Sequence, residues 1–217
     1  MKQHYRYFLF AAVVSAVPAA FAQNALDVNL GLGTAYAKAA TGGIDNQTFA
    51  SCTPGSIGGP TCQSLPNLSG VFMNVGGDVM FTEKYGIGAQ AAFQPATSNY
   101  GPLNSRVTLF DINGLYEPIR NKRYVVQLQG GMGVARTGFS YTANQCVGTA
   151  VCSSQVQPVG SASHFQVHVG AAVQVFVTDH IFVKPQFDFH YIPGFTDQFG
   201  SNVVPVFMIN VGYGTRR

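Results

Sequence analysis

A two-residue alternation between apolar and polar side chains runs through almost all of the chain after residue 25. In residues 26–33 the even positions are Leu26, Val28, Leu30 and Leu32, whereas the odd positions hold aspartate, asparagine and glycine. Side chains of a β-strand point alternately to opposite faces, so this pattern predicts strands with one apolar and one polar face. The alternating segments are about ten residues long, which is the length of a tilted strand that crosses a membrane.

Eight such segments follow one another along the chain. The predicted strands are 25–37, 70–82, 85–95, 106–116, 124–137, 163–177, 181–191 and 203–214. They predict an all-β fold, an eight-stranded antiparallel transmembrane up-and-down β-barrel. Short charged turns alternate with long connections, as periplasmic turns alternate with extracellular loops in such barrels. The expected long extracellular loops are 38–69, 96–105, 138–162 and 192–202.

The beginning of the chain has the features of a secretory signal peptide. A basic start is followed by an apolar run over residues 7–17 and by the small side chains of Ala20 and Ala22 at a cleavage site. We therefore predict that residues 1–22 are a cleaved signal peptide and that 23–217 form one transmembrane β-barrel domain with long extracellular loops. The expected location is the outer membrane of a double-membraned bacterium.

Charge is scarce in this chain, and its distribution restricts the partners. Hydrophobic residues make up 47% of the sequence and charged residues 10%, yet no run of about eighteen apolar residues follows the signal peptide, so no transmembrane helix is expected. Without the signal peptide, ten basic residues balance nine acidic ones. This balance offers no field that would attract nucleic acid. Outer-membrane lipids are the expected partners, and no cofactor is predicted.

The four cysteines form two local pairs in the sequence: Cys52 with Cys62, and Cys146 with Cys152. Four thiols allow three pairings, but an oxidising compartment and the short spacings favour these two disulfides, each within one long loop. The alternative is a zinc site, which would need closer pairs of the C-x-x-C kind.

Polar side chains on the second face of the strands are expected to fill the barrel. Eight strands enclose a space only just wide enough for side chains, so these groups should hydrogen-bond into a plug. Glycines on the same face, among them Gly131 and Gly133, would leave room for longer neighbours. The predicted plug residues are Asp27, Asn29, Asn74, Asp78, Gln90, Asp111, Asn113, Gln127, Gln129, Gln174, Lys184, Asp188 and Asn210.

With a signal peptide, eight strands, four long loops, a polar interior and the strand Phe-Asp-Ile-Asn-Gly-Leu-Tyr at 110–116, the chain resembles the opacity-protein and outer-membrane-protein-A-like barrel superfamily. The resemblance covers essentially the whole mature chain. It implies the barrel alone, without the soluble peptidoglycan-binding domain that larger members append. The last strand, which ends on Val211 and Tyr213, is similar to the aromatic-ended insertion signal of such barrels.

Two histidines form the sharpest local feature. His168 and His190 are predicted to lie opposite each other on adjacent strands, both facing inward, with Asp188 two residues along. Such a pair is able to bind a transition metal or to change its charge near pH 6. The alternative is two neutral imidazoles within the interior hydrogen-bond network. We favour this alternative, so no metal site is assigned and the two histidines are kept as candidates.

The predicted function is that of a non-enzymatic surface protein without catalytic residues. The barrel would present its disulfide-stapled loops for adhesion, for interaction with an extracellular protein or surface ligand, or for envelope stability. The alternative is a narrow pore for small solutes, which needs a water path past Asp78, Asp111 and Lys184. A third interpretation is an enzyme of outer-leaflet lipids, for which Ser161, Ser163 and His164 are candidates.

Overall fold

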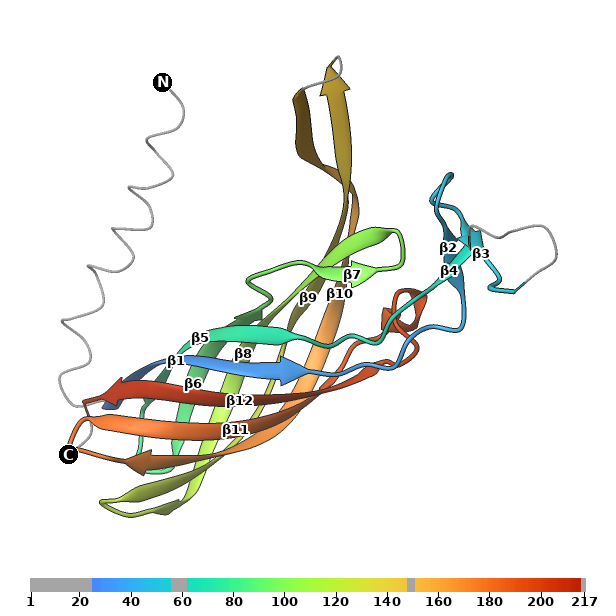
Figure 1. The fold of residues 1–217 in the computed structure, drawn as a ribbon. Helices are drawn as coiled ribbons and strands as arrows, with labels where there is room; N and C mark the ends of the chain where they lie inside the picture. The colour runs from blue at the N-terminus through green and yellow to red at the C-terminus, as the bar shows by residue number, and fades with distance from the viewer. Residues whose placement is uncertain (1–24, 56–61, 148–150, 216–217) are drawn as a thin grey trace, which may run out of the picture.

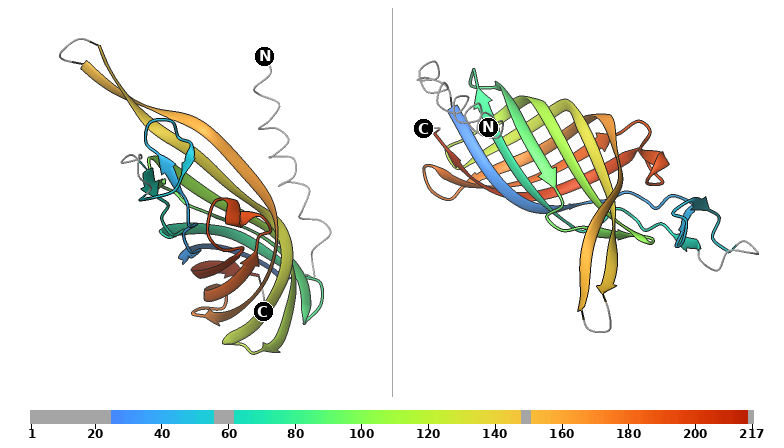
Figure 2. Two further views of the ribbon diagram at one scale, coloured as in Figure 1. Left: turned by 90° about the vertical axis from the view of Figure 1, so that its right-hand side faces the viewer. Right: turned by 90° about the horizontal axis from the view of Figure 1, so that it is seen from above.

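The computed structural model describes residues 25–55, 62–147 and 151–215. Eight of its strands form a closed antiparallel ring in which the last strand pairs with the first (Figure 1, Figure 2). The ring strands are β1 (Ala25–Ala35), β5 (Val71–Met80), β6 (Tyr85–Phe93), β8 (Leu103–Arg120), β9 (Tyr124–Val147), β10 (Val151–Phe176), β11 (Ile181–Tyr191) and β12 (Val203–Gly214). The predicted eight-stranded antiparallel transmembrane barrel is confirmed. The predicted signal peptide, 1–22, lies outside the described residues.

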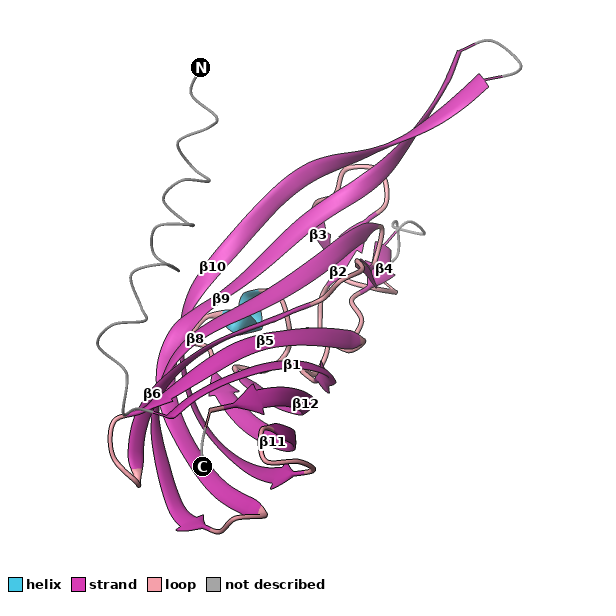
Figure 3. Cartoon of the chain, turned by 90° about the vertical axis from the view of Figure 1, so that its left-hand side faces the viewer, coloured by secondary structure: helices cyan, strands magenta, loops and turns pink. Residues whose placement is uncertain are grey.

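Smaller elements lie in the long connections. Strands β2 (Gly43–Asp45), β3 (Ser51–Cys52) and β4 (Cys62–Ser64) form a separate small sheet, which we call the stapled sheet. Strand β7 (Ser98–Tyr100) pairs with the start of β8. In the described residues the helical element is η1 (Phe195–Asp197), cyan in Figure 3. No helix in the described part of the chain has the length and apolar character to cross a membrane.

The alternation decides which face each side chain takes. On β1, Leu30 and Leu32 are 64% and 57% exposed, whereas Asp27 and Asn29 on the other face are buried. The same division holds on the other ring strands, so the outer face is a continuous band of exposed leucine, valine, isoleucine and aromatic side chains. A band of this extent is stable when lipid covers it.

Two of the short turns are near copies of each other. The Thr82 hydroxyl oxygen accepts a hydrogen bond from the Tyr85 backbone N–H at 2.9 Å, and Thr178 accepts one from the Ile181 N–H at 3.0 Å. These side-chain bonds close the turns without a glycine, because a threonine hydroxyl can take the place of a backbone acceptor. The outward parity survives both turns, and the Tyr85 ring stacks on Tyr116 at the rim, with 5.2 Å between centroids.

The segment 138–162, expected as a loop, is mostly a β-ladder. Strands β9 and β10 continue beyond the ring and form a projecting hairpin, here called the arm (Figure 1). The ladder is broken by an irregularity between Pro158 and Gly160. The alternation that marks a lipid-facing strand ends near residue 138 because the arm has no lipid to face, whereas the backbone pairing needs no such pattern. Sequence periodicity therefore places the end of β9 too early, at 137, and the start of β10 too late, at 163.

Buried side chains divide the barrel interior into layers. The end with the long connections, here called the mouth, contains an apolar cluster that includes Phe72, Phe195 and Phe199. At the opposite end, near the short turns, Phe182 and Leu115 are buried. Most of the other buried polar side chains lie between these two apolar layers, whereas Glu117 is buried at the short-turn end, where its backbone N–H donates to the Lys84 carbonyl oxygen.

Arginine at position 112 should distinguish the ring from the arm. Ile112 is 62% exposed in the middle of β8, and arginine at the bilayer midplane costs about 2–4 kcal/mol of folding free energy. Val156 on the arm is 67% exposed and serves as the matched control, for which arginine should cost less than about 0.5 kcal/mol. Urea unfolding in lipid vesicles measures both variants. Equal destabilisation would contradict the assignment of the ring to lipid and the arm to water.

Candidate functional site

The barrel interior gathers the predicted polar residues. Gln90 is partly buried, and the other predicted plug residues are buried. The side chains reach between strands that are not neighbours in the ring. Gln174 on β10, for example, donates to Asp27 on β1 at 3.1 Å.

One ion pair ties distant walls of the barrel together. The Lys184 Nζ on β11 lies 2.9 Å from Asp78 Oδ2 on β5, and both side chains are buried. Gln127 on β9 donates to the same carboxylate oxygen at 3.4 Å. Because a buried charge is costly unless it is paired and hydrogen-bonded, this triad makes the charge of Lys184 tolerable inside the barrel.

A chain of amide groups forms a second interior network. Asn74 donates to Asn210 Oδ1 at 2.8 Å, and Asn210 donates to Gln186 Oε1 at 3.3 Å. Gln186 in turn donates to Asp188 Oδ2 at 2.7 Å, and Gln129 donates to the other oxygen of Asp188. Both oxygens of Asp188 therefore accept hydrogen bonds from glutamine side chains, and the carboxylate in contact with the two histidines is a different one.

That carboxylate is Asp111. His168 and His190 pair in register on β10 and β11, and their rings stack with 4.9 Å between centroids. The His168 Nδ1 lies 3.2 Å from Asp111 Oδ1, and the His190 Nδ1 lies 3.9 Å from Asp111 Oδ2. All three side chains are buried. One ligand atom from each residue lies within 4.8 Å of the others, so the group has the donor types and proximity of a metal site.

Sequence reasoning missed Asp111 as a partner of these histidines. Strand β9 lies between β8 and β10, and it carries Gly133 opposite Asp111 and Gly131 opposite His168. With no side chain on β9 in between, the residues of β8 and β10 meet across it. The two inward glycines, two residues apart, are the sequence signal that points to this approach.

A set of aromatic contacts, here called the aromatic bridge, joins the connections at the mouth. The Phe49 ring of the 38–69 connection packs 5.2 Å from Tyr141 on the arm. Tyr100 packs 5.0 Å from Phe139 on the arm and 5.5 Å from Phe199 in the 192–202 connection. All four long connections therefore contribute a ring to one packed group.

Tyr100 also holds the bridge by its polar end. Its hydroxyl donates to the Gln198 carbonyl oxygen, and burial raises the pKa of Tyr100 to about 12. The hydroxyl therefore stays a donor at pH values where an ordinary tyrosine ionises. The contact fixes η1 and its flanks against β7.

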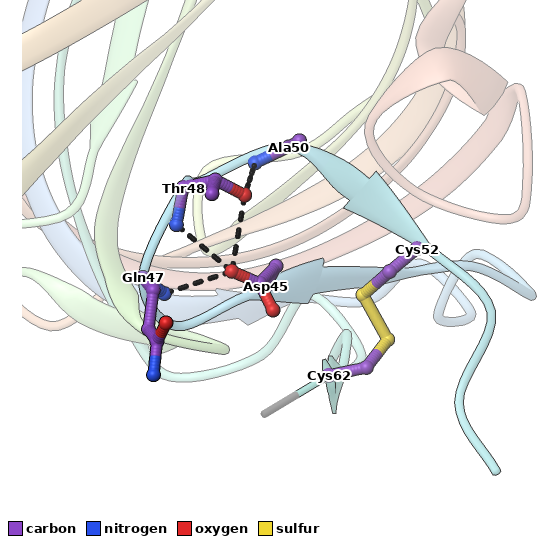
Figure 4. The surroundings of a disulfide bond; sticks show 6 residues. All are labelled: Asp45, Gln47, Thr48, Ala50, Cys52 and Cys62. Atoms are coloured by element: carbon purple, nitrogen blue, oxygen red, sulfur yellow. Dashed lines mark hydrogen bonds between the residues drawn. A yellow bond between two sulfur atoms is a disulfide. The ribbon is translucent and has the colours of Figure 1, made fainter. Parts of the chain in front are cut away.

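The stapled sheet contains the predicted disulfide between Cys52 and Cys62 (Figure 4). Asp45 organises the turn beside it, because its Oδ1 accepts the backbone N–H groups of Gln47 and Thr48 at 2.9 and 2.8 Å. Phe49 ends this turn in the left-handed region, with φ of 55°, which a non-glycine residue seldom adopts. The turn thus holds the Phe49 ring where it meets the arm.

The second predicted disulfide and the enzyme candidates have different outcomes. Cys146 and Cys152 pair in register on the arm, but their side chains are not among those that the structure describes, so their disulfide stays a prediction.

Ser161 and Ser163 are exposed on β10, whereas the His164 Nε2 lies 3.0 Å from Gln198 Oε1 inside the mouth. The structure does not bring these serines to the histidine.

The variant Lys184→Met should destabilise the barrel by about 3–5 kcal/mol, because it leaves the buried Asp78 carboxylate without its ammonium partner. The double variant Asp78→Asn/Lys184→Met removes both charges and should recover most of the loss. Urea unfolding measures the stability of both variants, and the slower migration of the unfolded barrel on a gel gives the unfolded fraction. A double variant no more stable than Lys184→Met would contradict the role of the pair.

Known proteins share this architecture. The family described as outer membrane protein beta-barrel domain matches residues 8–215. The structure is similar to the attachment invasion locus protein Ail of Yersinia pestis, solved with the heparin analogue sucrose octasulfate: identity is 11%, the TM-score is 0.51, and 88% of this chain and 98% of that chain are covered. No curated protein sequence matches the chain.

Two further solved structures are similar at comparable levels. Neisserial surface protein A has 9% identity and a TM-score of 0.49, with 89% of this chain and 99% of that chain covered. OprG from Pseudomonas aeruginosa has 15% identity and a TM-score of 0.49, with 88% and 96% covered. Structural similarity at such identities concerns the fold alone, whereas the family match spans nearly the whole chain. The chain therefore belongs to the outer membrane protein beta-barrel domain family and is a protein of the outer membrane.

Proposed function

We propose that the protein is a non-enzymatic surface protein whose barrel is a closed scaffold and whose arm and stapled sheet bind an extracellular partner. The aromatic bridge carries this proposal, because it packs the long connections into one surface. A surface that is already ordered loses less conformational entropy when it binds. With the short turns in the periplasm, the usual orientation of such barrels, this surface faces outward.

The surface offers hydrogen bonds and aromatic rings rather than charge. The arm segment 138–162 contains no Asp, Glu, Lys or Arg, and in the connections 38–69, 96–105 and 192–202 the charged residues are Lys38, Asp45 and Asp197. Asp45 is used inside its own turn. The proposed partner is therefore an uncharged polar surface of a protein, recognised by short-range contacts.

The arm supplies a specific means of recognition. In the described residues, β9 has no third strand beside it after Ser140, and β10 has none before Val167. Open strand edges present rows of backbone N–H and C=O groups that pair with an added strand. Such pairing depends on backbone hydrogen bonds, which agrees with the uncharged side chains of the arm.

The interior layers favour this role over the predicted pore. A path for small solutes would have to pass the apolar cluster at the mouth, the polar network and the buried Phe182 at the other end. The exposed serines and the inward His164 likewise favour a binding role over lipid turnover.

Removal of the arm should abolish binding while the barrel still folds. Tyr141 and Gln157 are cross-strand partners, so deleting residues 142–156 and joining them through an Asn-Gly turn keeps the ladder and the Phe49 contact. Bacteria that display the full chain should adhere to cultured host cells or to one another, and the shortened chain should reduce adherence to the level of bacteria without the barrel.

Two controls accompany this experiment. The shortened barrel must show the same heat-dependent gel shift as the full barrel, which verifies its folding. The variant Cys52→Ser/Cys62→Ser opens the stapled sheet and should lower adherence partly. Unchanged adherence after removal of the arm, or no adherence by the full chain, would contradict the proposed binding surface.

Sucrose octasulfate tests the chemistry of the surface. Because the long connections carry few charges, this polyanion should not bind the refolded barrel in calorimetry and should not compete with adherence. Adherence should also change little between low and high salt, since screening acts on charges. Tight binding of sucrose octasulfate would show that a charged surface is used instead.

A further inference from the structure

We propose that Asp111, His168 and His190 bind a divalent transition-metal ion inside the barrel. The site is independent of the binding surface at the mouth, because it lies on the inner face of β8, β10 and β11 within the polar layer. Two imidazole nitrogens and one carboxylate form a donor set suited to zinc and its neighbours among the divalent metals.

The donor atoms already stand close to coordinating positions. Two ligands of one tetrahedral zinc ion, each at about 2.0–2.1 Å from it, lie roughly 3.3 Å apart. The separation between His168 Nδ1 and Asp111 Oδ1 is 3.2 Å, and that between His190 Nδ1 and Asp111 Oδ2 is 3.9 Å. All three donor atoms lie within 4.8 Å of one another, so side-chain movements that total about 1–2 Å would bring them to one ion.

The donor atoms have few competing hydrogen bonds. Asp111 Oδ2, both ring nitrogens of His168 and the His190 Nδ1 are buried and have no hydrogen-bond partner among the described residues. Buried polar atoms are usually hydrogen-bonded, so four such atoms in one group require an explanation. Coordination of one cation would satisfy donors from all three residues together.

A neighbouring side chain fixes the carboxylate. Gln166 Nε2 donates to Asp111 Oδ1 at 2.7 Å, from the residue two positions before His168 on the same face of β10. Partners of this kind hold a ligand in its orientation and strengthen metal binding.

Glycines on β9 provide the space. A Cβ at Gly131 would lie 2.9 Å from His168 Cε1, and a Cβ at Gly133 would lie 2.7 Å from Asp111 Oδ1. Each Cβ would lie even closer to a backbone carbonyl oxygen of β8, that of Ile112 for Gly131 and that of Phe110 for Gly133, so a side chain at either position would push β8 away as well as disturb a donor residue. The cradle depends on two glycines that no turn requires.

The charge of the interior also favours a cation. Among the described residues, five acidic side chains are buried, whereas Lys184 carries the one buried ammonium group. The buried acids are Asp27, Asp78, Asp111, Glu117 and Asp188. Lys184 pairs with Asp78 at 2.9 Å, whereas Asp111 faces histidines. A divalent ion at Asp111 would offset negative charge where no lysine reaches.

Refolding in the presence of metal tests the site. The apolar layers at both ends would slow entry into a finished barrel, so the mature chain, without a histidine tag, is refolded with Zn²⁺ or Co²⁺ and then dialysed. Elemental analysis should find one ion per barrel, and the cobalt form should show visible absorption bands. The zinc form should also unfold at higher urea concentration than the metal-free form.

Matched variants assign the ligands. His168→Gln, His190→Gln and Asp111→Asn should each lose the retained ion, and Gln166→Leu should weaken binding by about 10–100-fold. His164→Gln, a histidine outside the group, should keep the ion. A wild-type barrel without retained metal and without cobalt bands, or equal loss in His164→Gln, would overturn the proposal. The wild-type measurement decides the matter even if a variant fails to fold.

Discussion

The structure depends on one constraint, which is that backbone N–H and C=O groups have no water to bind inside a bilayer. Each unpaired group there costs several kcal/mol, so strands cross only as a closed ring. The pairing of β12 with β1 removes the last open edge. Closure at eight strands then leaves a narrow interior, and the side chains of the second face have to fill it.

The need to fill this narrow interior with side chains explains its chemistry. Polar residues on this face meet others from distant strands, as Lys184 meets Asp78. Glycines alternate with these long side chains and allow contacts across an intervening strand, as Gly131 and Gly133 do for Asp111 and His168. The same narrow space that excludes a wide channel thus brings a carboxylate and two imidazoles together.

The sequence determined the ring more completely than the site. The alternation that separates Leu30 from Asn29 assigns most ring residues to a face, and the register of His168 with His190 follows from counting across a short turn. Contacts between non-adjacent strands depend on strand tilt and on side-chain length, which a single strand does not encode. Asp111 was therefore predicted as an interior residue but not as the partner of the histidines.

The mouth was the least predictable region. Its order arises from contacts between distant segments, such as Phe49 with Tyr141 and Tyr100 with Phe199, which leave no periodic pattern. The arm was missed because β-pairing outside lipid does not need alternating hydrophobicity. The two cysteines at its far end, Cys146 and Cys152, were the local sign that two chain segments approach there.

The central claim is that a filled, closed barrel serves as a scaffold and that recognition takes place at the mouth. Single-channel recording of the refolded mature barrel in a planar bilayer tests this claim most directly, once a gel shift has verified folding. The filled interior predicts a silent bilayer at all applied voltages. Steady, discrete conductance steps would contradict it and would assign the function to the interior charges around Asp78 and Lys184.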